Sequence, residues 1–339
     1  MKVEQRVGIV VLNWNSWRDT IFLLRQLLNI DCDKLTCFIV IVDNGSTDGS
    51  VNIISKWLGN YGINYSIINE DDIKSCNENN KMYRVVIIKN QNNYGYAGGM
   101  NRGIKFSLRC LGADYVALLN NDISVNKDFL VTMYKAFNHI TTGKYIGIVG
   151  PRVLDFYTGI EVGQPQVYIP LPLISFLQRF FRTLVVSSEA YRTYNYISVN
   201  RLDGCCYLVM SKVFNDVGFL KEEYFMYWED TVFFLRVKKK GYLLVFAPVS
   251  VVRHKIGGAN IWMRRINPRA SYYFARNMIN FIKFNYNNIE KYIVYLGAIL
   301  SLPVYLCINL CYYRNIQAFK YFLFGLIKGI LGETGKSIL

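Results

Sequence analysis

Apolar and polar positions alternate in blocks along the first 122 residues, and the blocks differ in period. The runs "VGIVVLN" (7–13), "CFIVIVDNG" (37–45), "RVVIIKN" (84–90) and "YVALLNND" (115–122) are short and apolar, which is typical of buried strands. The stretches between them space their apolar residues as helices do, for example "SWRDTIFLLRQLLNI" (16–30). Strands that alternate with helices predict an α/β fold, with a Rossmann-like, mostly parallel sheet and helices on both faces.

Each of these four strands ends in polar side chains. The ends are Asn13, Asp43 with Asn44, the segment 90–93, and the segment 120–122. Asn, Asp and Gly build turns, and that role accounts for any one of these ends. Because ligands of open parallel sheets bind outside the carboxyl ends of the strands, four polar ends in succession predict one polar ligand crevice.

The segment "NYGYAGGMNRG" (93–103) is a glycine-rich start to a helix. It has neither the GxGxxG spacing of a dinucleotide site nor the GxxxxGK[ST] spacing of a P-loop. Its glycines still permit the backbone to approach a phosphate or a sugar closely. A strand-end carboxylate such as Asp43 can accept from a base N–H or a ribose hydroxyl, so the crevice suits a nucleotide.

Charge and composition narrow the partners. The chain has 339 residues, 52% of them hydrophobic, and a formal charge of +15, which favours an anionic partner. Nucleic acid, phosphorylated small molecules and an acidic membrane surface all fit. The positive charge is concentrated near hydrophobic segments and no nucleic-acid motif is present, so we expect no nucleic-acid partner. The eight cysteines form no CxxC pair, and we expect them to be reduced, in a cytosolic setting.

Five motifs follow one another in an order that resembles a known family. They are "VVLNWNS", "VDNGSTDGS", "NYGYAGGMNRG", "LLNND" and "MYWED" (226–230). Over about 1–285 the chain resembles the family 2 glycosyltransferases with the GT-A fold, and in particular rhamnosyltransferase-like enzymes of bacterial surface polysaccharide assembly. The resemblance implies an inverting, metal-dependent transfer of a sugar from a UDP- or dTDP-linked donor to a hydroxyl. The implied acceptor is a lipid-linked glycan.

The resemblance also assigns the donor site, which draws on the strand ends and on the glycine-rich segment. The implied nucleotide-sugar contacts are Leu12, Asn13, Asp43, Asn93, Gly98, Gly99, Asn101, Asn120, Asn121 and Asp122.

In the family the fourth strand end carries a DxD-type motif that holds a divalent metal and the diphosphate. Here Asn120 replaces the first acid, and Asp122 fills the second place. Mg²⁺ or Mn²⁺ suits one or two carboxylates together with substrate phosphates. His254 resembles the histidine that follows the last core strand in the family and approaches the metal; the alternative is a loop histidine with a structural partner. His139 is expected to be structural.

The family's general base corresponds to Asp230. Transfer to a hydroxyl needs a group that takes its proton, and one base with direct attack implies inversion. The alternative is that acids in the first turn merely stabilise the helix dipole. The family often shows EDxD here, and Val232 replaces the second acid. The implied acceptor contacts are Gly204, Cys205, Trp228, Glu229 and Arg276.

The C-terminal segment differs from the rest. Residues 292–313 contain no charged side chain, and this uncharged stretch is long enough to cross a bilayer. However, Pro303 interrupts the stretch, and basic residues flank it on both sides. We therefore expect a kinked, in-plane or re-entrant arrangement, and an interfacial helix over 316–331 with a GxxxG contact at Gly325 and Gly329. The alternative is a buried pair of helices.

The predicted organisation is a catalytic domain over 1–286 and a membrane-association segment over 287–339, on the cytoplasmic face of the plasma membrane. Two other functions remain open at this point. One is a membrane-bound protein that binds nucleotides or glycans without catalysis, and the other is a nucleotidyltransferase that releases pyrophosphate.

Overall fold

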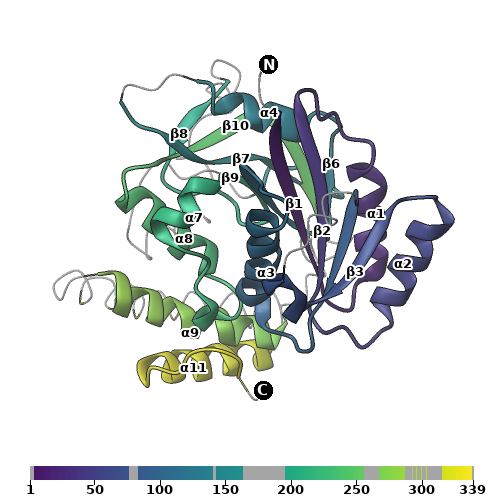
Figure 1. The fold of residues 1–339 in the computed structure, drawn as a ribbon. Helices are drawn as coiled ribbons and strands as arrows, with labels where there is room; N and C mark the ends of the chain where they lie inside the picture. The colour runs from purple at the N-terminus through teal and green to yellow at the C-terminus, as the bar shows by residue number, and fades with distance from the viewer. Residues whose placement is uncertain are drawn as a thin grey trace.

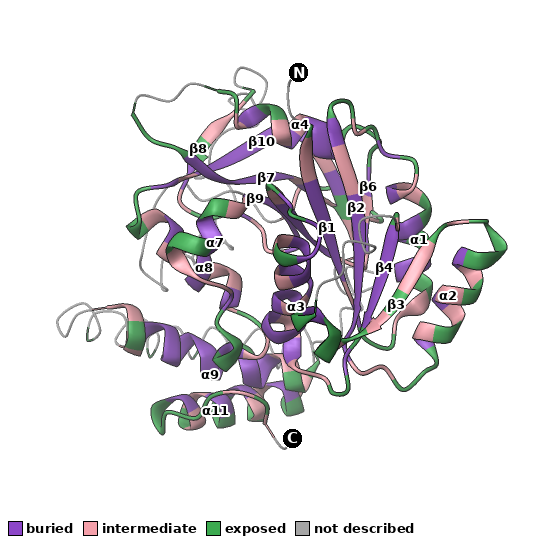
Figure 2. Ribbon diagram, viewed as in Figure 1, coloured by how far each residue is buried: buried purple, intermediate pink, exposed green. Residues whose placement is uncertain are grey.

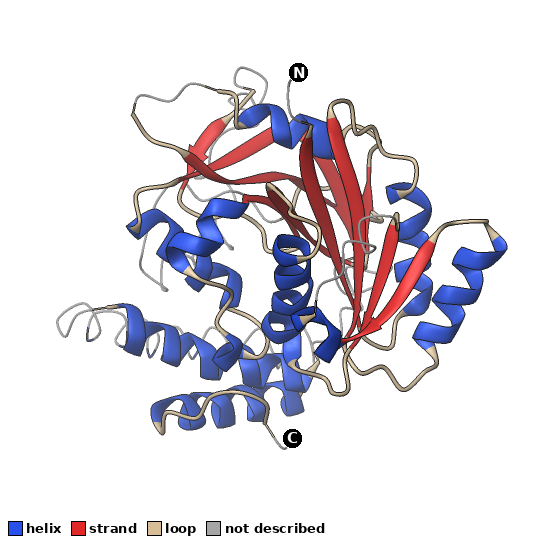
Figure 3. Ribbon diagram, in the orientation of Figure 1, coloured by secondary structure: helices blue, strands red, loops and turns tan. Residues whose placement is uncertain are grey.

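The structure, a computed structural model, describes residues 4–75, 83–139, 143–162, 195–255, 267–286 and 315–337, and the single positions 292, 295, 299 and 303. In this part of the chain a ten-stranded sheet forms the centre of the molecule, with helices on both faces (Figures 1 and 3). The strand order is β3-β4-β2-β1-β5-β9-β7-β10-β6, and β8 pairs with β10.

The N-terminal half of the sheet is parallel, as the sequence predicts. Its strands are β1 (Gln5–Asn13), β2 (Leu35–Asp43), β3 (Tyr65–Asn69), β4 (Val85–Lys89) and β5 (Tyr115–Asn120). The register places Asn13 opposite Asp43 and Leu12 opposite Asn120, so the polar strand ends meet at one edge. The half-exposed edge strand β3 has no long apolar run and was not predicted.

The C-terminal half of the sheet is mixed, which corrects the prediction of a mostly parallel sheet. Strand β9 (Cys206–Met210) is antiparallel to β5 and to β7 (Ile146–Asp155). Strand β10 (Leu243–His254) is parallel to β7 but antiparallel to β6 (Ile123–Val125) and β8 (Ile197–Val199). An apolar run indicates a buried strand but not its direction, and the pattern alone therefore missed this reversal.

Helices bury the two faces of the sheet in separate cores. One core contains α1 (Trp17–Leu27), α2 (Ser50–Asn60) and α4 (Phe129–Ala136), and the other α3 (Gly95–Arg109), α7 (Ser211–Val217) and α8 (Glu229–Lys239). Side chains alternate along a strand, so Ile9 and Val11 enter the first core and Val10 the second. The central strands are accordingly buried along most of their length (Figure 2).

Two C-terminal helices, α9 (Pro268–Asn285) and α11 (Ile316–Ile330), lie side by side (Figure 1). Gly325 and Gly329 make this contact possible, because a Cβ at Gly329 would lie 2.7 Å from the carbonyl oxygen of Arg276. The expected GxxxG contact is confirmed. Most of 292–313 lies outside the described residues. Among the helices that the structure describes, none combines the length and the apolar character needed to cross a membrane.

One cysteine departs from the expectation of reduced thiols. Cys110, which follows α3, is disulfide-bonded. The other described cysteines, Cys32, Cys37, Cys205 and Cys206, are free, so the partner of Cys110 lies outside the described residues. Irregular cysteine spacing carries no pairing signal, and the sequence therefore did not predict this bond.

Candidate active site

A chain of hydrogen bonds joins the ends of β1, β2 and β5. The amide of Asn13 donates to Asp43 Oδ2 at 2.7 Å, and Asp43 Oδ1 accepts from the backbone N–H of Ser46 at 3.0 Å. Thr20 Oγ1 donates to Asn13 Oδ1 at 2.7 Å and accepts from Asn121 Nδ2 at 3.0 Å. The structure thus brings Asn13, Asp43 and Asn121 together at the carboxyl edge of the sheet, as the sequence predicts.

Asn44 organises the neighbouring strand ends, a role that the sequence analysis missed. Its Nδ2 donates to Asn93 Oδ1 at 3.1 Å and to the carbonyl oxygen of Gly95 at 2.9 Å. Its Oδ1 accepts from Asn90 Nδ2 at 3.0 Å and from the backbone N–H of Tyr94 at 3.2 Å. Asn44 is buried, and it holds the loop before α3 against β2. The sequence feature that could have indicated this role is the position of Asn44 directly after Asp43, at the end of β2.

Three residues of α3 that the sequence assigns to the donor make packing contacts. A Cβ at Gly99 would overlap the side chain of Leu12, and one at Gly98 would lie 2.7 Å from Tyr94 Cβ. Both glycines therefore let α3 approach its neighbours. The buried Asn101 donates to the carbonyl oxygen of Leu220 at 2.9 Å and accepts from its N–H at 3.0 Å. Gly98, Gly99 and Asn101 therefore have packing roles, and their assignment to the nucleotide stays a prediction.

The predicted metal residues do meet. His254, at the end of β10, places Nε2 3.1 Å from Asp122 Oδ1. His254 Nδ1 and Asn120 Oδ1 are buried without a hydrogen-bond partner in the described part of the chain. Orphaned buried polar atoms are costly, and a cluster of them marks a place for a ligand or an ion. The donor set of carboxylate, imidazole and amide oxygen fits a divalent cation.

Two further side chains approach the same imidazole. Asp203, Cys205 and His254 each bring one ligand atom within 4.8 Å of the others. Burial opposes protonation of His254, but the hydrogen bond and charge of Asp122, with the charge of Asp203, raise its pKa above the ordinary 6.5. Burial likewise raises the pKa of the Cys205 thiol well above its usual range. Asp203 was missed by the sequence analysis because its contact with His254 spans fifty residues.

The predicted base lies beside this cluster. A Cβ at Gly204 would lie 3.0 Å from Asp230 Cγ and closer still to Oδ2, so the glycine makes room for this carboxylate. Asp230 Oδ1 accepts from the backbone N–H and the hydroxyl of Thr231. Tyr96 donates its hydroxyl to the carbonyl oxygen of Gly204 at 3.2 Å. Because Gly204 stands between Asp203 and Cys205, the short segment 203–205 contacts the base Asp230 and also reaches His254.

Glu229 is a buried carboxyl group next to Asp230. It is 6% exposed, and its Oε2 has no hydrogen-bond partner among the described residues. Burial, and then the charge of Asp230, raise the pKa of Glu229 to about 8. Burial also raises the pKa of Tyr96 and of Tyr207 well above the ordinary value for tyrosine. Glu229 is therefore neutral at pH 7, beside the carboxylate of Asp230.

The loop before Asp230 has unusual backbone angles. Phe225, Tyr227 and Trp228 all have positive φ, between 62° and 74°. Left-handed conformations of non-glycine residues cost of order 1–3 kcal/mol each and persist only where surrounding contacts enforce them. The amide of Asn277 on α9 supplies these contacts, because it donates to the carbonyl oxygens of Tyr224, Met226 and Tyr227 at 2.6, 2.8 and 3.1 Å.

Two predicted acceptor residues donate hydrogen bonds to backbone carbonyl oxygens. Arg276 is 1% exposed and donates to the carbonyl oxygens of Tyr224, at 3.2 Å, and Gly335, at 2.7 Å. The indole of Trp228 donates to the carbonyl oxygen of Phe274 at 3.1 Å. Arg276 therefore holds the C-terminal helices to the base loop, which corrects its assignment to the acceptor.

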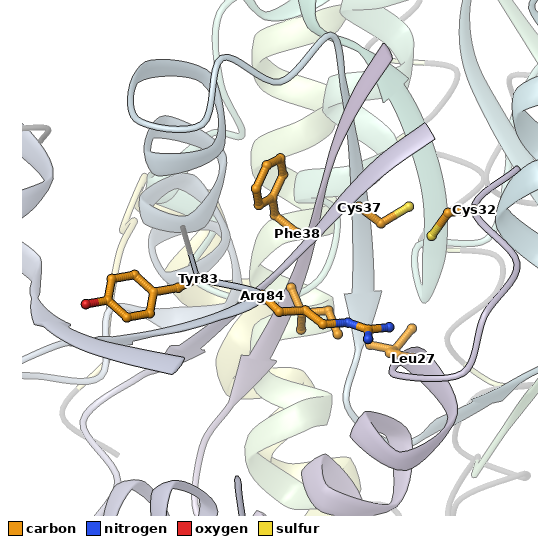
Figure 4. Close-up of a pocket in the computed structure, with 7 residues that line it drawn as sticks. Leu27, Cys32, Cys37, Phe38, Tyr83 and Arg84 are labelled. Carbon is orange, nitrogen blue, oxygen red and sulfur yellow. The ribbon is translucent and has the colours of Figure 1, made fainter. Parts of the chain in front are cut away.

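A separate pocket of about 300 Å³ lies at the N-terminal ends of β2 and β4 (Figure 4). It is lined by Cys32, Cys37 and Arg84 among others, and the two thiols face each other. The hydrogen bond with Cys37 lowers the pKa of Cys32; burial opposes this shift and Arg84 adds to it. This pocket lies at the opposite end of the strands from the motif residues and takes no part in the strand-end site.

Comparison with known proteins defines the class. Residues 8–202 match the family described as Glycosyl transferase family 2. This match covers more than half of the 339 residues, so the chain belongs to glycosyltransferase family 2 and is a glycosyltransferase. The nucleotidyltransferase and the non-catalytic alternatives are thereby set aside.

The individual relatives have low sequence identity to this chain, but the alignments extend over most of its length. It is 24% identical over 343 residues to the low-salt glycan biosynthesis hexosyltransferase Agl10 of Haloferax volcanii, covering 99% of this chain and 95% of the relative. It is 25% identical over 248 residues to the dTDP-rhamnosyl transferase RfbF of Shigella flexneri, covering 72% and 77%. The mannosyltransferase PcManGT of Pyrobaculum calidifontis, solved with GDP-Man and Mn²⁺, gives a TM-score of 0.57 at 14% identity, covering 98% and 88%. This likeness confirms the GT-A fold.

Proposed function

We propose that this protein transfers a sugar, with inversion, from a UDP- or dTDP-linked donor to a hydroxyl of a lipid-linked glycan acceptor, in a metal-dependent reaction. The observation that carries the proposal is the position of Asp230. Its carboxylate stands against Gly204, and the residues on either side of that glycine reach His254, which contacts Asp122. The proposed proton acceptor and the proposed cation ligands therefore lie on either side of one short segment, 203–205.

In the proposed reaction Asp230 accepts the proton of the acceptor hydroxyl as its oxygen attacks the anomeric carbon. The bond from that carbon to the donor diphosphate breaks on the opposite face, so the configuration inverts. The products are the glycosylated acceptor and a nucleoside diphosphate, with the proton held on Asp230. The neutral neighbour Glu229 adds no second negative charge to repel the incoming hydroxyl as it deprotonates.

Asp122 and His254 are the residues that would hold Mg²⁺ or Mn²⁺, because their side chains meet at 3.1 Å and the buried Nδ1 of His254 has no hydrogen-bond partner among the described residues. Such a cation supplies charge stabilisation for the departing diphosphate. In the structure of the mannosyltransferase PcManGT, Mn²⁺ accompanies GDP-Man, which supports this choice of cation.

The donor nucleotide is assigned to the edge formed by Asn13, Asp43 and Asn121. Asp43 uses one lone pair on each oxygen for Asn13 and Ser46, which leaves acceptor capacity for a base N–H or a ribose hydroxyl. The dTDP-rhamnosyl transferase RfbF, 25% identical, supports a dTDP donor. Asn93, fixed by Asn44, borders the same edge.

We assign the cytoplasmic face of the plasma membrane as the location, and α11 as the docking helix. The side of α11 that faces away from α9 carries exposed apolar side chains. They are Ile316, Leu323, Ile327 and Ile330, and the exposed Leu331 follows the last residue of the helix. Lys320 lies among them, and the chain carries a charge of +15, which favours an anionic lipid surface. A lipid-linked acceptor would be presented at that surface.

The test of the chemistry compares the native enzyme with Asp230→Asn in a panel of UDP- and dTDP-sugars. Removal of a general base costs about 10²–10⁴-fold, so kcat should fall by that factor while donor affinity is retained. Chelation should stop transfer, and Mg²⁺ or Mn²⁺ should restore it. The matched control is Asp128→Asn, on the exposed start of α4. Near-normal kcat in Asp230→Asn, or full activity in excess chelator, would contradict the proposal.

The test of the membrane site uses flotation with anionic vesicles. Ile327→Glu combined with Ile330→Glu should abolish binding, because both side chains are exposed and lie opposite the packed glycines. The control is Tyr145→Glu, which charges an equally exposed side chain far from α11. Equal flotation of both variants would refute this surface.

A further inference from the structure

The loop that precedes β9 contains an acid that no strand-end motif includes. We propose that Asp203 replaces the missing first acid of the metal motif, so that Asp122, His254 and Asp203 together hold the divalent cation. This inference rests on the proposed metal-dependent transfer and adds a chain-specific ligand to it.

The imidazole of His254 lies near two carboxylates, those of Asp122 and Asp203. Its Nε2 lies 3.1 Å from Asp122 Oδ1, and ligand atoms of His254, Asp203 and Cys205 lie within 4.8 Å of one another. Asp203 Oδ1 accepts from the backbone N–H of Cys205 at 2.9 Å, which fixes the direction of the carboxylate. The second sign of an ion site is the buried Nδ1 of His254, which has no hydrogen-bond partner among the described residues.

The position of Asp203 explains how the substitution at Asn120 is tolerated. The backbone N–H of Asn120 donates to the carbonyl oxygen of Cys205 at 2.9 Å, so the end of β5 adjoins the loop that carries Asp203. An acid lost from the strand end is thus supplied from the neighbouring loop. Asp122 and Asp203 provide two negative charges, which balance a divalent cation beside a neutral imidazole.

The choice of Asp203 over Cys205 follows from ligand chemistry. Mg²⁺ and Mn²⁺ are hard cations that prefer oxygen, whereas thiolate suits zinc and other softer metals. The Cys205 side chain is 2% exposed and belongs to the apolar core on the α1 face of the sheet. An oxygen-preferring cation would therefore use the carboxylate and leave the thiol unused.

This arrangement also ties the cation to the base. Asp203 is followed directly by Gly204, the residue against which the carboxylate of Asp230 rests. Binding of the cation by Asp203 would fix the loop that sets the position of Asp230. Asp203 is therefore a metal ligand that also positions the base.

The experiment measures Mn²⁺ affinity directly, by electron paramagnetic resonance of free Mn²⁺, for the metal alone and with inorganic pyrophosphate. Since loss of an outer-shell partner alone costs about 10–100-fold, Asp203→Asn should weaken Mn²⁺ binding at least about tenfold. Asn120→Asp in the Asp203→Asn background should restore most of it, because it returns an acid to the strand end. Cys205→Ala should keep the native Mn²⁺ affinity within about threefold.

The outcomes separate this inference from the function on which it rests. Native Mn²⁺ affinity in Asp203→Asn, with loss in Asp122→Asn, overturns the role of Asp203 and leaves the metal-dependent transfer standing. Loss in Cys205→Ala instead indicates a thiolate site and also overturns the inference. If the native protein and Asn120→Asp bind no Mn²⁺ even with pyrophosphate, the proposed metal dependence itself is wrong. Circular dichroism of each variant confirms that the fold is retained.

Discussion

Replacing Glu229 by Gln should stabilise the protein above neutral pH, even though it alters a buried residue beside the base. Burial and the charge of Asp230 raise the pKa of Glu229 to about 8, from an ordinary value of 4.5. In the unfolded chain the carboxyl loses its proton near 4.5, while in the folded protein it keeps that proton until about pH 8. Between these values the folded state binds the extra proton, so stability falls as pH rises.

The magnitude follows from the size of the shift. Each pKa unit corresponds to about 1.4 kcal/mol, and pH 7.5 lies about three units above the ordinary value. The buried carboxyl therefore costs up to about 4 kcal/mol of unfolding free energy at pH 7.5 and almost nothing near pH 5. Gln has nearly the same shape and cannot ionise, so Glu229→Gln should remove this cost.

The assay is guanidinium unfolding of the native protein and Glu229→Gln at several pH values from 5.5 to 8.5. The stability difference should grow by about 1 kcal/mol per pH unit in favour of the variant, because other titrating groups cancel between the two proteins. The control is Glu223→Gln, whose side chain is 41% exposed and should give a small difference at every pH. A difference for Glu229→Gln that is the same at pH 5.5 and 8.5 would falsify the reasoning.

Three other substitutions test other parts of the site and fold. Asp43→Ala removes a charged hydrogen-bond acceptor, and a hydrogen bond to such a group is worth about 1.5–3 kcal/mol. Calorimetry with UDP and dTDP should therefore show at least about tenfold weaker binding, and unchanged affinity would rule out this donor contact. Gly204→Ala should push the Asp230 carboxylate aside and lower kcat about 10²-fold, with donor affinity intact. The control Gly59→Ala should have no such effect, because a Cβ at Gly59 would meet no atom closer than 3.9 Å. Gly325→Val should separate α11 from α9 and lower stability by about 1–3 kcal/mol in chemical unfolding, and an unaffected transition would show that this contact is not needed.

Much of the fold was predictable because hydrophobic period and strand length are local properties. The runs that became β1, β2, β4 and β5 are continuously apolar and bounded by polar residues, and their parallel order follows from the helices between them. The direction of β9 was not predictable, since the run "CYLVM" looks the same in either orientation. The edge strand β3 lacks an apolar run altogether.

The site was predictable to the level of motifs but not of side-chain direction. Asp122 and His254 meet as expected, and Asp230 lies beside them. In contrast, Asn101 and Arg276 lie within recognisable motifs and yet point into packing contacts with Leu220 and the base loop. A motif fixes where a residue sits along the chain, whereas the direction of its side chain depends on partners that are distant in sequence.

The strained loop before the base has a consequence for exchanging parts between enzymes of this kind. Its left-handed residues rely on the amide of Asn277, and Gly335 donates its backbone N–H to the carbonyl oxygen of Glu223 at 2.6 Å, just before that loop. A chimera that takes a new acceptor region but ends it after α8 would lose the partners that enforce these backbone angles. The transplantable unit therefore runs from Asp203 to the C-terminal tail, and a seam placed between the base and α9 should yield a folded enzyme with a displaced base.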